Sequence, residues 1–113
     1  IQMCFDFINK NKRESPKMTV HVVAEFPLTE SGAKDMIEWS VSDDGFVVTR
    51  QYKGYQDIKQ FLAEDNKTII LTQKWDSKDD HQAYLKARVD GGFLEWLKPR
   101  LAGEFKVTYL TEV

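Results

Sequence analysis

The last third of the chain has the pattern that constrains the fold most. A β-rich run over residues 67–75 is followed by Ser77, a residue type that caps helices, and by an amphipathic segment that reaches about Val89. Two glycines end this predicted helix, and a shorter helical piece follows over residues 93–97. Residues 105–110 then alternate in polarity, which predicts a closing strand.

The first half of the chain supplies the matching elements. Residues 19–26 are dense in β-branched side chains and predict a strand, and Thr29 or Ser31 can cap a following helix. The residues expected to share one face of that helix are Ala33, Met36, Ile37, Ser40 and Val41. A strand over 55–62 is joined to the strand over 67–75 by a polar turn. The order β-α-β-β-α-β predicts an α+β fold of the ferredoxin-like type.

Length limits the domain count. With 113 residues the chain is long enough to bury one core and too short for two. Its periodic pattern starts at Met18. We therefore interpret residues 18–113 as a single domain and residues 1–17 as an N-terminal extension that is a candidate for removal.

Charge and cysteine content narrow the partners. The chain has 16 basic and 18 acidic residues, a formal net charge of -2, so it has no broad cationic field for nucleic acid or an anionic membrane surface. Its opening segment lacks the basic-then-apolar order of a signal peptide. Cys4 is its only cysteine and has no partner within the chain for a disulfide. A reducing cytoplasm is the expected location.

The strands have apolar residues on both sides. Ile69, Leu71 and Trp75 alternate with Ile70, while the helices of a ferredoxin-like fold cover only one face of the sheet. A second sheet packed face to face would bury the other face. We therefore expect a homodimer in which two such domains form a dimeric α+β barrel.

Several motifs together resemble the antibiotic biosynthesis monooxygenase family over residues 18–113. The motifs are Val22-Val23-Ala24-Glu25-Phe26, Thr49-Arg50 with Gly54, Lys74-Trp75-Asp76-Ser77 and Leu101-Ala102-Gly103. The resemblance implies a ligand cavity between sheet and helices. It also implies, for some members, oxidation of polycyclic phenols by oxygen without metal or flavin, in which the protein supplies a base, an apolar pocket and stabilisation of an anion.

This sequence departs from two branches of the family. In the haem-degrading branch, the haem-contacting Asn aligns with Phe26, a Trp aligns with Tyr84, and the iron-ligating His falls near Leu94 or Leu97. No cofactor is therefore expected, since a missing His ligand is not easily replaced. The quinone-forming branch pairs a third-strand Trp with an Asn four positions earlier. Trp75 matches that Trp, but the Asn position holds Leu71.

Candidate catalytic residues lie on the predicted helix after Ser77. His81, Tyr84, Leu85 and Arg88 have the spacing of one helix face, and the polar members suit a cavity wall better than a core. His81 is the candidate base, Tyr84 the candidate proton or hydrogen-bond donor, and Arg88 the candidate clamp for a carboxylate or phenolate.

A structural interpretation of the same helix remains open. His81 and Arg88 can lie at the helix edge, with Arg88 paired to Asp90 or Glu95. Asp79 and Asp80 next to His81 do not make a metal site, because neighbouring residues on a helix point in different directions.

Four aromatic side chains and one leucine supply the candidate ligand contacts. The residues proposed to bind the ligand are Trp39, Trp75, Phe93, Trp96 and Leu97. The alternative is that these residues form plain core, which is the usual place for aromatics at such spacings.

Two functional classes follow. The first is a cofactor-independent monooxygenase that acts on an apolar or aromatic substrate. The second is a non-catalytic binder of a small apolar metabolite, such as a fatty-acid-like or polyketide-like molecule. The missing Asn favours the second class, and the family resemblance favours the first.

Overall fold

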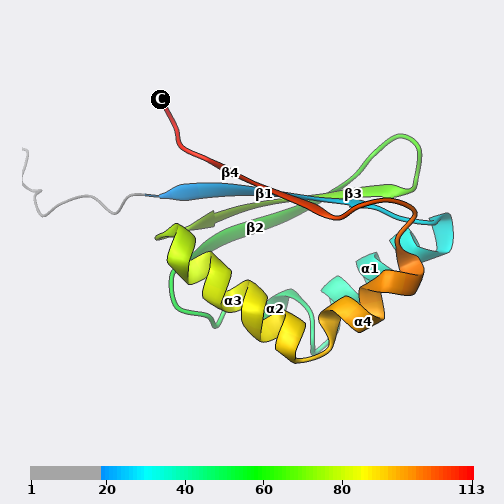
Figure 1. Cartoon of the computed structure of the whole chain (residues 1–113), viewed down its shortest axis with the longest axis horizontal. Coiled ribbons are helices and arrows are strands. Elements are labelled where there is room, and N and C mark those ends of the chain that lie inside the picture. Colours follow the sequence, from blue (N-terminus) through cyan, green and yellow to red (C-terminus); the bar gives the residue numbers. More distant parts are fainter. Residues whose placement is uncertain (1–18) are drawn as a thin grey trace, which may run out of the picture.

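The computed structural model describes residues 19–113, in which the strands form one antiparallel sheet of order β2-β3-β1-β4. The elements are β1 (Val20–Pro27), α1 (Glu30–Ser40), α2 (Phe46–Thr49), β2 (Tyr55–Leu62), β3 (Thr68–Trp75), α3 (Lys78–Asp90), α4 (Phe93–Leu97), the 3-10 helix η1 (Lys98–Arg100) and β4 (Lys106–Leu110). All helices lie on one face of the sheet (Figure 1). The predicted ferredoxin-like α+β fold is confirmed, and the predicted extension over residues 1–17 lies outside the described residues.

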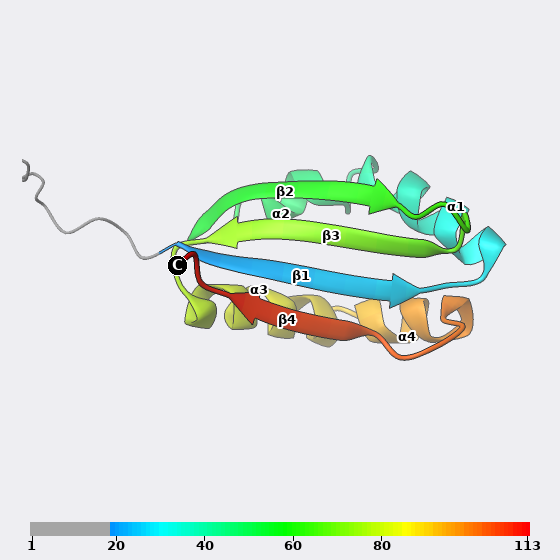
Figure 2. The same cartoon turned by 90° about the horizontal axis from the view of Figure 1, so that it is seen from above.

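Buried residues alternate with more exposed ones along β1, and the buried ones form part of the core. Val22, Ala24 and Phe26 are almost fully buried, and the register pairs Ala24 with Leu71 of β3 and with Val107 of β4. Because paired residues lie on the same face of a sheet, this row faces the helices. Figure 2 shows α1 and α2 on the β2 side of the sheet and α3 and α4 on the β4 side, so the core between them is enclosed by both groups of helices.

Both predicted helix caps form. The hydroxyl of Thr29 accepts a hydrogen bond from the Gly32 N–H at 3.0 Å, and the hydroxyl of Ser77 accepts one from the Asp80 N–H at 3.1 Å. Each cap satisfies an N–H group that has no partner within its helix. The caps therefore start α1 and α3 where the sequence predicted.

Two local expectations were wrong. Ala33, Met36 and Ser40 are buried on α1, but Ile37 and Val41 are exposed at 38% and 85%. The helix ends at Ser40, so its buried stripe is narrower than predicted. Residues 46–49, for which the sequence predicted no helix, form α2, which is too short to give a helical period in the sequence.

The sheet face away from the helices is mixed. Val23 and Ile70 are half-buried there, and Phe61 and Leu110 are about half exposed. Charged residues alternate with them on the same face: Glu25, Asp57, Lys59, Lys74 and Lys106. The open face is thus more polar than the sequence predicted, although an apolar residue reaches it from every strand.

Candidate functional site

A cavity of about 30 Å³ lies between the sheet and the helices. Its wall is mainly apolar, and the polar side chains that line it are Gln73, His81, Tyr84 and Arg88. The proposed catalytic residues His81, Tyr84 and Arg88 are therefore brought together, with Trp39 and Phe93 from the proposed ligand contacts. This volume holds roughly one or two water molecules. A larger ligand thus requires the wall to move.

A surface groove of about 430 Å³ adjoins the cavity. Trp39, Arg88 and Phe93 line both hollows, whereas Trp96 lines the groove and not the cavity. The Trp39 and Phe93 ring centroids are 5.3 Å apart, and those of Phe93 and Trp96 are 5.9 Å apart. Aromatic side chains therefore separate the groove from the cavity, and their movement would join the two volumes.

Trp75 and Leu97 lie in the core rather than at either hollow. Both are fully buried, and neither lines the cavity or the groove. The Trp75 ring packs against Tyr84 at 5.1 Å and against Tyr55 at 5.9 Å between centroids. The structure therefore places these two proposed ligand contacts in packing positions.

His81 is buried beside Tyr109. Its Nδ1 lies 2.9 Å from the Tyr109 hydroxyl, and its ring packs edge-on against Trp75 at 5.6 Å between centroids. Burial disfavours the charged imidazolium and lowers the pKa of His81 from 6.5 to about 4. At neutral pH the ring is uncharged, and it is a weaker base than the unperturbed imidazole assumed from the sequence.

Tyr84 and Arg88 belong to a hydrogen-bond network that joins α3 to α2 and to the loop before α2. The Tyr84 hydroxyl lies 2.8 Å from the Thr49 hydroxyl and accepts a hydrogen bond from Arg88 Nε at 3.0 Å. Arg88 Nη1 donates to the Asp44 carbonyl at 2.8 Å. Arg88 Nη2 donates to the Gly45 carbonyl at 2.9 Å and to the Thr49 hydroxyl at 3.0 Å. These contacts fasten α3 to the loop between α1 and α2.

The charge of Arg88 is not neutralised by a nearby carboxylate. Asp90, one of the partners considered from the sequence, instead accepts a hydrogen bond from Lys86 at 2.7 Å. Arg88 makes no ion pair with Glu95 or any other carboxylate between residues 19 and 113. Its guanidinium carbon lies 4.9 Å from the centre of the Trp39 ring. A positive charge over an aromatic wall therefore borders the cavity, which favours an anionic or electron-rich ligand group.

Gln73 is a cavity residue that was not predicted from the sequence. This residue is 5% exposed, lines the cavity, and accepts a hydrogen bond from the Trp75 indole N–H at 2.8 Å. The strand pattern could have identified it, because the alternation of side chains places residue 73 on the same face of the sheet as Leu71 and Trp75. β3 thus presents the carboxamide of Gln73 to the cavity. The family resemblance placed an Asn two positions earlier, where this chain has Leu71.

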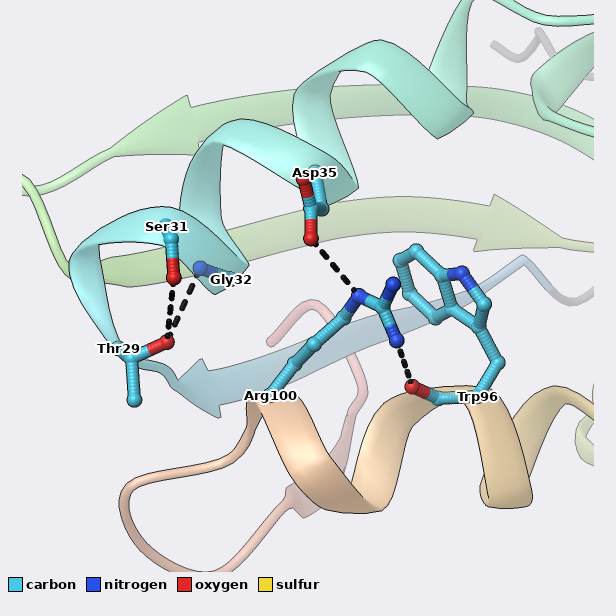
Figure 3. Close-up of polar contacts among 6 residues, drawn as sticks. All are labelled: Thr29, Ser31, Gly32, Asp35, Trp96 and Arg100. Atoms are coloured by element: carbon cyan, nitrogen blue, oxygen red, sulfur yellow. Dashed lines mark hydrogen bonds and ion pairs between the residues drawn. The ribbon is translucent and has the colours of Figure 1, made fainter.

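A second set of polar contacts lies beside Trp96, where Arg100 meets Asp35 (Figure 3). Arg100 Nε donates to the Asp35 carboxylate at 3.0 Å, and Arg100 Nη1 donates to the Trp96 carbonyl at 2.6 Å. The guanidinium carbon also lies 4.2 Å from the centre of the Trp96 ring. This junction joins α1 to the end of α4 and holds Trp96 in place.

The described histidines do not fit haem ligation. His21 lies on the open face, and His81 lines a cavity of about 30 Å³, which is too small for a porphyrin. No group of three or more His, Cys, Asp or Glu that could hold a metal ion occurs among residues 19–113. No helix in the same residues is long and apolar enough to cross a membrane.

The low pKa of His81 predicts a specific loss of stability in acid. An unfolded chain protonates this histidine near pH 6.5, whereas the folded state resists protonation down to about pH 4. The free energy of unfolding should therefore fall as the pH drops through this window, by at most about 1.4 kcal/mol per pH unit from this group. Urea unfolding at several pH values should show a weaker acid dependence for His81→Asn than for the unmodified protein. Identical pH profiles would contradict the burial of a neutral His81.

Comparisons with known proteins support the fold. No family model matches the chain, and no curated protein gives a significant match to its sequence. A monooxygenase from the gene ActVA-Orf6 of Streptomyces coelicolor, in complex with the ligand Nanaomycin D, is 18% identical. It has a TM-score of 0.70, and the match covers 88% of this chain and 91% of that chain.

Two further solved structures give similar values. A conserved protein from Methanosarcina mazei Go1 is 11% identical with a TM-score of 0.72, and the match covers 86% of this chain and 95% of that chain. An antibiotic biosynthesis monooxygenase is 10% identical with a TM-score of 0.67, covering 83% of this chain and 98% of that chain. This chain therefore has the fold of the antibiotic biosynthesis monooxygenase structures.

Proposed function

We propose that this protein binds a small apolar or aromatic molecule in the cavity between the sheet and the helices. The observation that carries the proposal is the apolar cavity bordered by Arg88, a cation without a carboxylate partner in the described part of the chain. Small-molecule sites combine such apolar walls with a few placed polar groups. The ligand enters from the surface groove when Trp39 and Phe93 move apart.

Calorimetric titration with 1-naphthol tests this proposal. Ala24→Leu fills part of the cavity and should weaken binding by about tenfold or more, the effect of roughly 1.4 kcal/mol of lost contact or added strain. Ala33→Leu is the matched control, because Ala33 is equally buried but does not line the cavity. Equal weakening in both variants, or no binding by the unmodified protein, would contradict the proposal.

Cofactor-independent oxygenation is the second candidate function. It is supported by the likeness in fold to the monooxygenase crystallised with Nanaomycin D. In such a reaction 1-naphthol and O₂ would give 1,4-naphthoquinone and water, with all electrons coming from the substrate. A base is needed to form the phenolate, and the low pKa of His81 makes it poorly suited to that role. Binding is therefore the primary proposal, and oxygen uptake coupled to quinone formation would establish catalysis.

We also propose that the protein is a homodimer joined through the open face of the sheet. Apolar residues reach this face from every strand: Val23, Phe61, Ile70 and Leu110. A hollow of about 450 Å³ on this face is lined by residues that include Val23, Lys59, Lys74 and Leu110. The sheet of a partner subunit would cover these apolar side chains. The charged residues of the partner's open face would then contact the charged residues that alternate with the apolar ones on this face.

A further inference from the structure

The orientation of the Gln73 carboxamide is set by its neighbour. The Trp75 indole N–H can only donate a hydrogen bond, so the atom 2.8 Å from it must be the Gln73 oxygen. The NH₂ group of Gln73 then points away from Trp75. Gln73 Nε2 has no acceptor among residues 19–113, and it is not one of the fully enclosed unpaired atoms, so it keeps contact with open space. Gln73 is 5% exposed and lines both the cavity and the hollow on the open face.

The contacts of His81 allow its other ring nitrogen to be a second donor. The Tyr109 hydroxyl lies 2.9 Å from His81 Nδ1 and also has a hydrogen bond with the Gln82 side chain. If Gln82 donates to the Tyr109 oxygen, the hydroxyl proton is free to point at Nδ1, which leaves the imidazole hydrogen on Nε2. His81 Nε2 also has no hydrogen-bond partner in the described part of the chain, and the residue lines the cavity.

We propose that Gln73 Nε2 and His81 Nε2 together form a two-donor site that binds a carbonyl or phenolate oxygen of the ligand. The inference rests on the proposed function, since it names the ligand group recognised in the same cavity. Both residues line the cavity and neither N–H group has an acceptor among the described residues, so an oxygen atom with two lone pairs could accept a hydrogen bond from each. Arg88 lines the same cavity, so an oxygen with partial or full negative charge is favoured.

This site makes Gln73 a residue that determines specificity, and Trp75 the residue that positions it. A ligand that has the aromatic body but lacks the oxygen would leave both donors unpaired. Such ligands are rejected strongly by sites that are built to hydrogen-bond an oxygen. The ratio of the affinities for the two kinds of ligand therefore measures what the two donors contribute, separately from the contribution of the apolar wall.

Two probes of similar size separate these contributions: 1-naphthol, which has an oxygen, and 1-methylnaphthalene, which has none. The unmodified protein should bind 1-naphthol about 10- to 100-fold more tightly, as expected when buried donors gain a partner. Gln73→Leu should remove most of this preference. Gln60→Leu is the control. Gln60 is a half-buried glutamine on the same helix-facing side of the sheet as the buried Gln73, but it does not line the cavity.

Further variants test the arrangement if Gln73→Leu does not fold. Gln73→Glu keeps an acceptor for Trp75 but replaces the donor with a carboxylate oxygen, so it should lose the preference for 1-naphthol. Trp75→Phe removes the group that orients the carboxamide and should reduce the preference without abolishing it. In the unmodified protein, the side-chain NH₂ resonances of Gln73 should shift on addition of 1-naphthol and not with 1-methylnaphthalene.

The outcomes distinguish this site from the proposed function. Equal affinity for the two probes, or an unchanged preference in Gln73→Leu, would overturn the two-donor site and leave the ligand cavity standing. Failure of both probes to bind would remove the proposed function and the site with it. A lost preference in Gln60→Leu as well would show that the effect is not specific to Gln73.

Discussion

Ile70→Lys is expected to convert the proposed homodimer into a folded monomer. Ile70 lies on β3 at the open face, and the register places it between Glu25 of β1 and Phe61 of β2. Between two packed sheets, a lysine ammonium group would lose its water, which costs several kcal/mol. In a monomer the same group stays hydrated and lies near the Glu25 carboxylate. The substitution should therefore raise the dimer dissociation constant by about 100-fold or more while the fold is kept.

Sedimentation velocity across a wide dilution series measures this effect. Val41→Lys is the matched control, since Val41 is 85% exposed at the end of α1, on the helix side of the sheet. It should leave the sedimentation coefficient unchanged at every concentration. If the unmodified protein is already a folded monomer at micromolar concentration, the homodimer proposal is wrong. The unfolding midpoint of a true dimer should also rise with protein concentration.

Arg88→Ala is expected to lower the free energy of unfolding by about 2–4 kcal/mol. The side chain donates hydrogen bonds to two backbone carbonyls, those of Asp44 and Gly45, and to the hydroxyls of Thr49 and Tyr84. Hydrogen bonds from a charged group are stronger than neutral ones, and their loss leaves partly buried acceptors without partners. The loop before α2 would thus lose its attachment to α3.

Urea unfolding measures this loss, and Lys86→Ala on the same helix is the control. Lys86 forms an exposed ion pair with Asp90, a type of contact that contributes little. Arg88→Lys should give an intermediate result, because lysine keeps the charge but lacks the planar fork that reaches several acceptors. An unfolding free energy in Arg88→Ala equal to that of Lys86→Ala would contradict the structural role.

The Arg88 network also changes how ligand-binding variants must be interpreted. From the sequence, Tyr84 and Arg88 were candidate ligand contacts, and an ion pair with Asp90 or Glu95 was the structural alternative for Arg88. In the structure both side chains also hold the α1–α2 connection through Thr49. A weaker affinity in Arg88→Ala therefore combines lost contact with a loosened wall. Gln73, which does not take part in this network, is the better position at which to test recognition.

Local pattern was sufficient to predict the order of elements. Alternating apolar residues mark β1 and β3, and Thr29 and Ser77 mark the starts of α1 and α3, because strand period and helix caps depend on residues close in sequence. Helix spacing also predicted that His81, Tyr84 and Arg88 share one helix face, and all three line the cavity. It missed α2, whose four residues are too few to show a period.

The chemistry of the site depended on contacts between distant segments. The sequence by itself determined the ferredoxin-like order and the helix face that carries the polar residues, since both follow from local periodicity. Only the tertiary structure decided that His81 is buried beside Tyr109 with a lowered pKa, and that Arg88 reaches carbonyls more than 40 positions away. The environment of a charged or polar side chain is set by whichever groups the fold packs around it, and those groups come from α2, β3 and β4 together.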